Sequence, residues 1–235
     1  MENVSKPQRG NMDNSPLLPW KKVMIGYSHQ ERAIPFYLSQ LSGGLSLDLL
    51  IMGAMHGDEP ESAQITNYIL NECNFISSRV GLIPIVNPDG LANLQRANAA
   101  GVDLNRNFPT RDWQEERQST RYYSGLSAAS EPETQFIISV LQHYTPRHIV
   151  SIHTFYQMIN TDGPADEIAR KMSAVNGYPI QPNIGYPTPG SFGTYVGKER
   201  NIPTITLELA EGKISLDEIK KNVSAIKVII NNGYT

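Results

Sequence analysis

The sequence predicts one α/β domain with a mixed, mostly parallel central sheet and helices on both of its faces. Three observations predict this class. Short apolar runs with strand patterns alternate with helical patterns along the chain, as in folds built around parallel sheets. The 235 residues suffice for one large domain with its own hydrophobic core. The sequence contains no repeat, no low-complexity tract and no clear linker, so a second domain is not indicated.

The first half of the chain contains four predicted strands and one predicted helix. Residues 1–20 are polar and include Pro and Gly, which predicts an N-terminal extension ahead of a folded domain at 21–235. Pro60 suits the first turn of a helix, and Asn-Pro-Asp-Gly at 87–90 is a strong turn signal. The predicted elements are strands at Lys22–Tyr27, Ile34–Leu38, Ser46–Ala54 and Val80–Val86, and a helix at Glu61–Glu72.

The second half begins with a long irregular segment, residues 87–129. Compact domains seldom contain such a loop unless it has a function. Ser130 and Glu133 have the spacing of a capping box, and they predict a helix that ends at about His143. Beyond it, the pattern predicts strands at Ile149–His153 and Thr204–Leu209, and helices at Asp166–Ala174 and Leu216–Ile230.

The charge and cysteine content exclude several classes of protein. The 20 basic and 23 acidic residues give a net charge of −3, and no stretch is basic enough to predict binding to nucleic acid or to a membrane surface. Cys73 is the only cysteine, so the chain forms no internal disulfide. No apolar signal segment and no apolar run of about 20 residues is present. We therefore expect a soluble, cytoplasmic protein.

His56 and Glu59 stand three residues apart in the turn that follows an apolar run. At this spacing both side chains can reach one metal ion, and His153, at the end of another apolar run, offers a third ligand. Two histidines and one glutamate with an open fourth position are the ligand set of a catalytic zinc site. A second interpretation stays open, because a histidine at a strand end is more commonly a hydrogen-bonded residue, and His-x-x-Glu is common by chance.

Four candidate positions lie at or just after the predicted carboxyl ends of strands: His56, the loop at Asn87, His153 and Glu208. Ligands of open α/β sheets bind at this edge. Glu208 belongs to the apolar run Thr-Ile-Thr-Leu-Glu-Leu, where a carboxylate is unusual without a function. The sequence therefore predicts that these residues meet at one edge of the sheet.

Seven motifs follow one another as they do in the zinc metallocarboxypeptidases, the M14 peptidase family, and the chain resembles that family from about Gly26 to its C-terminus. Each motif is weak alone, but the ordered set is specific. Within the family the chain is most similar to the bacterial murein peptide amidases. The motifs are Gly-Ala-Met-His-Gly-Asp-Glu at 53–59, Asn-Pro-Asp-Gly at 87–90, Arg-Ala-Asn-Ala-Ala-Gly-Val-Asp-Leu-Asn-Arg-Asn-Phe-Pro at 96–109, Ser-Glu-Pro-Glu-Thr at 130–134, Ser-Ile-His at 151–153, Tyr-Pro-Thr-Pro-Gly-Ser-Phe-Gly at 186–193 and Thr-Leu-Glu at 206–208.

This resemblance implies a zinc-carboxypeptidase-like fold and one zinc ion per chain, with His56, Glu59 and His153 as its ligands. It implies that Glu208 is the general base, which takes a proton from water and passes it to the leaving amine. It also implies that Arg96 stabilises the oxyanion of the scissile carbonyl.

The remaining implied roles concern substrate binding and positioning. By resemblance, Asn105 and Arg106 bind the α-carboxylate of the substrate, and a planar guanidinium suits a carboxylate because it binds both oxygens. Asp103 matches the carboxylate that orients the first zinc histidine. Tyr186 matches a mobile tyrosine that closes over the substrate.

Two departures from the digestive carboxypeptidases bear on the substrate. Between the zinc histidine and glutamate this chain has Gly57-Asp58, where those enzymes have an arginine. Seven residues after Tyr186, at their specificity position, it has Gly193, which predicts a roomier pocket with polar walls. Both departures favour a peptidoglycan fragment, because meso-diaminopimelate has a long side chain that ends in an amino and a carboxyl group.

The sequence therefore predicts a zinc amidase that cleaves the γ-D-glutamyl–meso-diaminopimelate bond of murein peptides, with a small peptide as its partner. Two alternatives of the same chemistry remain: a carboxypeptidase for ordinary peptide C-termini, and an N-acyl amino acid hydrolase of the aspartoacylase type. A binding protein without catalysis is a third alternative, and an intact Glu208 argues against it. The oligomeric state does not follow from the sequence.

Overall fold

The computed structural model describes residues 20–39, 44–75, 78–115, 121–182 and 185–231. The predicted N-terminal extension lies outside these residues except for Trp20, so the proposed boundary at residue 21 stays a prediction. Among the described helices, none combines the length and the apolar composition needed to cross a lipid bilayer.

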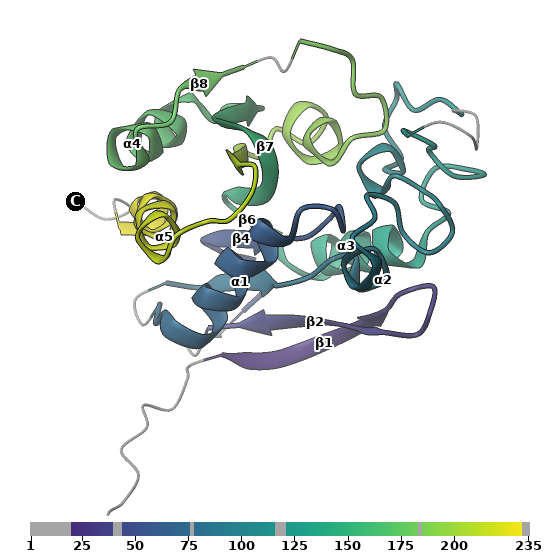
Figure 1. Cartoon of the computed structure of the whole chain (residues 1–235), viewed down its shortest axis with the longest axis horizontal. Coiled ribbons are helices and arrows are strands. Elements are labelled where there is room, and N and C mark those ends of the chain that lie inside the picture. The colour runs from purple at the N-terminus through teal and green to yellow at the C-terminus, as the bar shows by residue number, and fades with distance from the viewer. Residues whose placement is uncertain (1–19, 40–43, 76–77, 116–120, 183–184, 232–235) are drawn as a thin grey trace, which may run out of the picture.

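A mixed sheet of seven strands lies at the centre of the described chain (Figure 1). Its strand order is β1-β2-β5-β4-β7-β8, and β9 pairs with β7. The two N-terminal strands are antiparallel, whereas β5, β4, the first half of β7 and β9 are parallel. The predicted mixed, mostly parallel sheet is therefore confirmed. The strands are β1 (Lys21–Tyr27), β2 (Ala33–Leu38), β4 (Leu49–Met52), β5 (Val80–Ile83), β7 (Ile149–Asp162), β8 (Ile180–Gln181) and β9 (Thr204–Ala210).

Strand β7 folds back on itself around β9. Its first half runs parallel to β9, from Ile149 beside Thr204 to His153 beside Glu208. Its second half runs the other way, from Met158 beside Glu208 to residue 162 beside Thr204. The reversal occurs at residues 155–157, where Phe155 and Gln157 have positive φ angles of 144° and 49°. Both edges of β9 are thereby paired with β7.

Helices cover both faces of the sheet, as predicted, and the face that a side chain joins follows the strand alternation. In β4, Leu49 and Ile51 belong to the core under one helical layer, whereas Leu50 and Met52 belong to the core under the other. The first layer contains α1 (Pro60–Glu72), α4 (Asp166–Asn176) and α5 (Leu216–Asn231); the second contains α3 (Pro132–His143) and the π-helical turn η2 (Thr194–Lys198) (Figure 1).

Four short elements complete the described chain. They are β3 (Ser46–Leu47) and β6 (Thr145–Pro146), which form a second small sheet, the helix α2 (Pro88–Asn93) and the 3-10 turn η1 (Leu104–Arg106). The latter two lie within the predicted irregular segment 87–129, which otherwise forms turns and loops in its described part.

Four sequence predictions need correction. The strand predicted at Ile149–His153 continues to Asp162 as β7. The run Ser46–Ala54 is interrupted at Asp48, whose carboxylate accepts a hydrogen bond from the Arg79 backbone, so two short strands replace one long strand. The strand predicted at Val80–Val86 ends at Ile83. The capping box at Ser130 is wrong: Glu131 is the N-cap of α3 and makes no side-chain capping bond. The Glu133 carboxylate accepts instead from Asn98 and from the His29 backbone.

Candidate functional site

The turn from β4 to α1 carries His56 and Glu59 to the carboxyl edge of the sheet. Gly57 within this turn lies so close to the backbone of Gly90 that a Cβ at position 57 would collide with it. The motif at 53–59 and the motif at 87–90 therefore depend on each other sterically. The Glu59 carboxylate does not cap α1, although Glu59 is its N-cap residue, and it points toward the two histidines instead.

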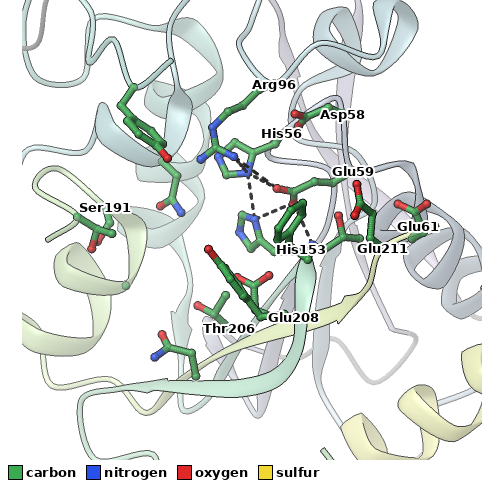
Figure 2. A pocket seen from close by; sticks show the side chains of 18 of the residues that line it. His56, Asp58, Glu59, Glu61, Arg96, His153, Ser191, Thr206, Glu208 and Glu211 are labelled. Atoms are coloured by element: carbon green, nitrogen blue, oxygen red, sulfur yellow. Dashed lines mark hydrogen bonds and ion pairs between the residues drawn. The ribbon is translucent and has the colours of Figure 1, made fainter. Parts of the chain in front are cut away.

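His56, Glu59 and His153 are buried, and their potential ligand atoms all lie within 4.8 Å of one another. Glu59 Oε1 is 2.7 Å from His56 Nδ1, and Glu59 Oε2 is 2.9 Å from His153 Nδ1. The two Nδ1 atoms are 3.2 Å apart. The three side chains that the sequence selected from distant positions thus converge on one point (Figure 2).

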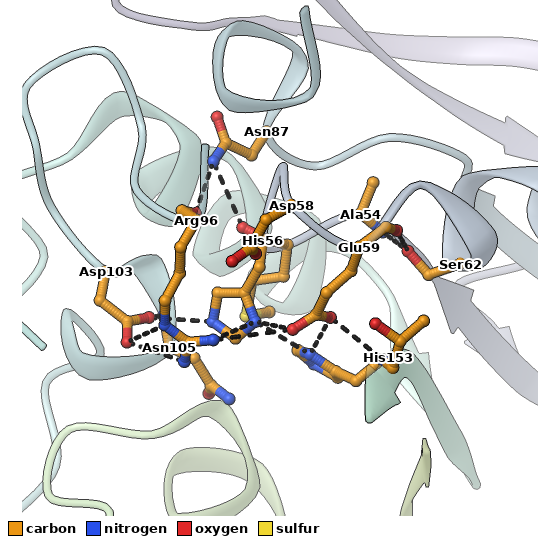
Figure 3. A network of polar contacts seen from close by, with 12 residues as sticks. Ala54, His56, Asp58, Glu59, Ser62, Asn87, Arg96, Asp103, Asn105 and His153 are labelled. Carbon is orange, nitrogen blue, oxygen red and sulfur yellow. Dashed lines mark hydrogen bonds and ion pairs between the residues drawn. The ribbon is translucent and has the colours of Figure 1, made fainter. Parts of the chain in front are cut away.

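Each histidine is held through the nitrogen that faces away from this point. His56 Nε2 lies 3.0 Å from Asp103 Oδ1, and His153 Nε2 lies 3.1 Å from Ser151 Oγ. Asp103 Oδ2 also accepts hydrogen bonds from Arg96 Nε at 3.1 Å and Nη2 at 2.9 Å. Figure 3 shows His56, Arg96 and Asp103 joined with Glu59 and His153 in one continuous network. One buried carboxylate therefore positions both a histidine and an arginine.

The remaining Arg96 nitrogen, Nη1, faces the centre of the site. It lies 3.2 Å from His56 Nδ1 and 3.6 Å from Glu59 Oε1. The guanidinium is also 5.6 Å from the centroid of the Tyr122 ring. Because Nε and Nη2 are both bound to Asp103, the direction of the guanidinium is fixed, and Nη1 is the nitrogen left for a ligand.

The electrostatics of the site stabilise charged groups despite their burial. Burial by itself lowers the pKa of His56, but the negative charges of Glu59 and Asp103 outweigh it and raise that pKa to about 9. Burial by itself raises the pKa of Glu59, and the attraction of His56 and His153 reverses this and places it far below its usual range. The pKa of Asp103 is also far below its usual range, because His56 and Arg96 outweigh its burial.

Glu208 differs from the other two carboxylates. It is 9% exposed, and its Oε2 atom is buried without a hydrogen-bond partner among the described residues. Burial raises the pKa of Glu208 to about 7, and the negative charge of Glu59 adds to this against the opposing attraction of His153. Glu208 is the register partner of His153 on the adjacent strand. A carboxylate that titrates near neutral pH beside such a site can exchange protons with a ligand.

These residues line a cavity of about 730 Å³. Figure 2 shows Ser191 on one side of the histidines, and Glu61 and Glu211 on the other. Arg96, Asn105, Arg106 and Tyr186, which the sequence singled out, line the cavity together with Glu208. Asp103 lies behind them and does not line it. The volume is in the range of small-molecule sites.

Asn105 and Arg106 belong to η1, which the loop before η2 holds in place. Asn105 Oδ1 accepts a hydrogen bond from the Phe192 backbone N–H at 2.9 Å, so the amide NH₂ group of Asn105 faces the cavity. Arg106 is buried, donates from Nη1 to the Asn105 carbonyl at 2.7 Å and lies 5.1 Å from the Tyr122 ring centroid. Both residues therefore present hydrogen-bond donors, which suits an anionic ligand.

Tyr186 lies at the rim of the cavity and is 38% exposed. Its ring centroid is 6.4 Å from that of Tyr122. Burial and the neighbouring Tyr156 raise the pKa of the Tyr186 hydroxyl, so it stays a neutral donor.

Sequence reasoning missed several residues of the site. Ser151 has a visible signal, because it stands two residues before His153 and therefore on the same face of the strand. No sequence pattern identifies Tyr122. It lies in an irregular loop, and its ring meets Arg96 and Arg106 only in the folded structure. Asn160 and Asp162 also line the cavity, and they belong to the second half of β7, which the sequence did not predict as a strand.

Comparison with known proteins identifies relatives across most of the chain. The family model described as "Zinc carboxypeptidase" (Peptidase_M14) matches residues 20–169. Murein peptide amidase A of Escherichia coli strain K12 is 34% identical over 180 residues, which cover 72% of this chain and 73% of that protein. Murein peptide amidase A of Vibrio campbellii is 33% identical over 196 residues, which cover 78% and 77%.

Solved structures share the fold. The crystal structure of the murein-tripeptide amidase of Escherichia coli O157 superimposes with a TM-score of 0.76 at 27% identity, and covers 89% of this chain and 92% of that chain. Carboxypeptidase A of Helicoverpa armigera gives the same TM-score at 19% identity, over 91% of this chain and 68% of that chain. The predicted zinc-carboxypeptidase-like fold is therefore confirmed.

Proposed function

Because this chain belongs to the M14 zinc carboxypeptidase family and is a hydrolytic enzyme, we propose that it cleaves the γ-D-glutamyl–meso-diaminopimelate bond of murein peptides. The observation that carries this proposal is the similarity to murein peptide amidase A over nearly three quarters of both chains. The polar cavity beside a potential metal site supports it.

We propose zinc as the cofactor, with His56, Glu59 and His153 as its ligands. The residues fit such an ion. The outer nitrogens of both histidines are occupied by Asp103 and Ser151, so both Nδ1 atoms point at the same place. A carboxylate oxygen from Glu59 faces each of them, and two imidazoles with one carboxylate form a known catalytic zinc set. When bound, zinc supplies Lewis-acid activation of water and of the scissile carbonyl.

The other residues have roles that follow from their charge and direction. Glu208 takes a proton from the attacking water, for which a pKa of about 7 is suited. Arg96 donates from Nη1 to the oxygen of the scissile carbonyl as negative charge develops there. Glu208 then passes its proton to the leaving nitrogen, which completes the hydrolysis.

Asn105 and Arg106 bind the amino acid that leaves with the scissile nitrogen. Both present donors to the cavity, and we assign them to the carboxylate next to the scissile nitrogen. Tyr186, at the rim, is placed to cover the bound peptide. Asp103 acts through others, because it holds His56 and Arg96 and does not line the cavity.

A direct test compares two substrates with and without a zinc chelator. The substrates are L-Ala-γ-D-Glu-meso-diaminopimelate and a peptide of ordinary α-linked residues with a free C-terminus, and mass spectrometry identifies the products. Chelator-sensitive release of meso-diaminopimelate from the first substrate alone is the expected result. Preferential cleavage of the second would make the chain an ordinary carboxypeptidase. The expected cytoplasmic location stays a prediction, which cell fractionation tests.

A further inference from the structure

A stripe of polar side chains lines the floor of the cavity beyond Glu208. In β9, Ile205 and Leu207 belong to the hydrophobic core under α1, α4 and α5, so the alternate residues Thr206 and Glu208 face the cavity, which both line. In the second half of β7, Asn160 and Asp162 line the same cavity. Asn160 is the register partner of Thr206, and Asp162 is that of Thr204. Figure 2 shows Thr206 next to Glu208.

Asp162 stands at the far end of this stripe and presents a carboxylate oxygen. The residue is 9% exposed. Its Oδ1 atom lies 3.2 Å from Lys198 Nζ, whose side chain is 60% exposed and does not line the cavity. Among the described residues no donor is hydrogen-bonded to Oδ2. Lys198 therefore fixes the carboxylate from outside, and Oδ2 stays available for a ligand.

Gly193 makes room for this carboxylate. A Cβ at position 193 would collide with Asp162 Oδ2. The backbone does not require glycine there, because Gly193 has φ −59° and ψ −42°, ordinary right-handed helical values. The reason for a glycine is thus the space that Asp162 occupies, and the position where the digestive enzymes carry a specificity residue is filled by a carboxylate from β7.

Asn160 adds a second acceptor. Its Nδ2 donates to the Gln181 carbonyl at 2.7 Å, so its amide oxygen is the atom left for the cavity. This is the opposite orientation to Asn105, whose oxygen is bound and whose NH₂ group is free. The end of the cavity at Asn160 and Asp162 therefore offers acceptors and negative charge, whereas the end at Asn105 and Arg106 offers donors and positive charge.

We propose that Asp162, together with Asn160, binds a primary ammonium group at the far end of the side chain of the substrate's leaving amino acid. This inference rests on the proposed function, since it names the residues that bind the side chain of the leaving amino acid. Four residues separate the levels of Glu208 and Asp162 along the strands, which is roughly 13 Å. An extended diaminopimelate, with six bonds between its amino nitrogens and a hydrogen bond at each end, covers roughly the same distance.

The test uses pairs of substrates that differ only in the distal ammonium group. The first pair is L-Ala-γ-D-Glu-L-Lys and L-Ala-γ-D-Glu-L-norleucine, and the second pair joins the same two amino acids to benzoylglycine. The zinc-loaded wild-type enzyme is expected to prefer lysine over norleucine by about tenfold or more in kcat/KM, because a buried charged hydrogen bond is specific. In Asp162→Asn this preference falls to about threefold or less, through a higher KM for the lysine substrate, while cleavage of the norleucine substrate stays within about twofold.

Two further variants keep the test decisive. Gly193→Ala leaves Asp162 in the chain but displaces its carboxylate, so it is expected to reduce the same preference. Glu211→Gln removes another carboxylate that lines the cavity, on the side of the histidines away from Ser191 (Figure 2), and it is expected to keep the wild-type preference. Melting temperatures identify any variant that is unfolded, and in that case the other of the two test variants decides the question.

The outcomes separate the two proposals. A wild-type enzyme without a preference for lysine, an unchanged preference in Asp162→Asn, or an equal loss on both substrates would each overturn the inference. If the γ-D-glutamyl pair is not cleaved while the benzoylglycyl pair is, the proposed function fails. The effect of Asp162→Asn on the preference for lysine is still measurable with the benzoylglycyl pair, because Asp162 is proposed to contact only the leaving amino acid.

Discussion

The substitution Glu208→Gln is expected to make the zinc-free protein more stable at pH 8 while it removes catalysis. Glu208 is buried, and its Oε2 atom has no partner among the described residues. A charge in such a place disfavours folding. Gln has nearly the same shape as protonated Glu, so the substitution removes the charge and preserves the packing.

The magnitude follows from the pKa of Glu208, which burial raises from 4.5 to about 7. At about 1.4 kcal/mol per pH unit, this corresponds to about 3 kcal/mol. Below pH 4.5 the carboxyl group is protonated in both the folded and the unfolded state, so it has no effect. As the pH rises from 4.5 to 7 the unfolded state ionises first, and the folded state loses stability. Above about pH 7 the full cost is present.

The assay is urea unfolding of both proteins in the presence of chelator at pH 4.5 and at pH 8. The free energy of unfolding of the variant should exceed that of the wild type by up to about 3 kcal/mol at pH 8 and by almost nothing at pH 4.5. Glu211→Gln serves as the control, because Glu211 is exposed and its substitution should change stability by at most about 0.5 kcal/mol. Equal stability of variant and wild type at pH 8 would refute the buried-charge argument. With zinc, turnover by the Glu208→Gln enzyme should fall at least about 10²-fold.

Three other substitutions test the remaining roles. His153→Ala should abolish stoichiometric zinc binding, measured by metal analysis after dialysis, and retention of one zinc per chain would remove His153 from the ligand set. Asp103→Asn should weaken zinc affinity by about 10- to 100-fold, because His56 loses the carboxylate that orients it. Competition with a chromophoric chelator measures this affinity, and an unchanged value would mean that Asp103 positions Arg96 but not His56. Arg106→Lys should raise KM with a smaller effect on kcat, since a point charge does not replace the two-pronged guanidinium, and a wild-type KM would speak against carboxylate binding by Arg106.

The fold could be predicted from the sequence wherever side chains alternate between two apolar cores. Strand β4 is such a case, because all four of its residues are buried and each face has its own helices. The second half of β7 could not be predicted. Asn160 and Asp162 face a polar cavity, so the strand lacks the apolar pattern that identifies its neighbours. The polar residues that line the cavity thus replace the apolar alternation by which a strand is predicted from sequence.

The candidate site was predictable where one short motif holds the residues in place. His56 and Glu59 lie on one turn, and the turn geometry is enforced by the close approach of Gly57 to Gly90. Residues that meet only in three dimensions are harder to find. Tyr122 approaches Arg96 and Arg106 from an irregular loop, and no spacing in the sequence encodes that contact.

The polarity of the cavity depends on two amide groups whose orientations the backbone fixes. Asn105 gives its oxygen to the Phe192 N–H, and Asn160 gives its NH₂ group to the Gln181 carbonyl. Neither amide can turn over without leaving a main-chain group unpaired, which is costly in a buried place. Under the proposed assignment, a ligand must therefore place its carboxylate near Arg106 and its ammonium group near Asp162. A ligand with these groups exchanged would meet like charges at both ends, so the cavity selects the direction of the leaving amino acid as well as its length.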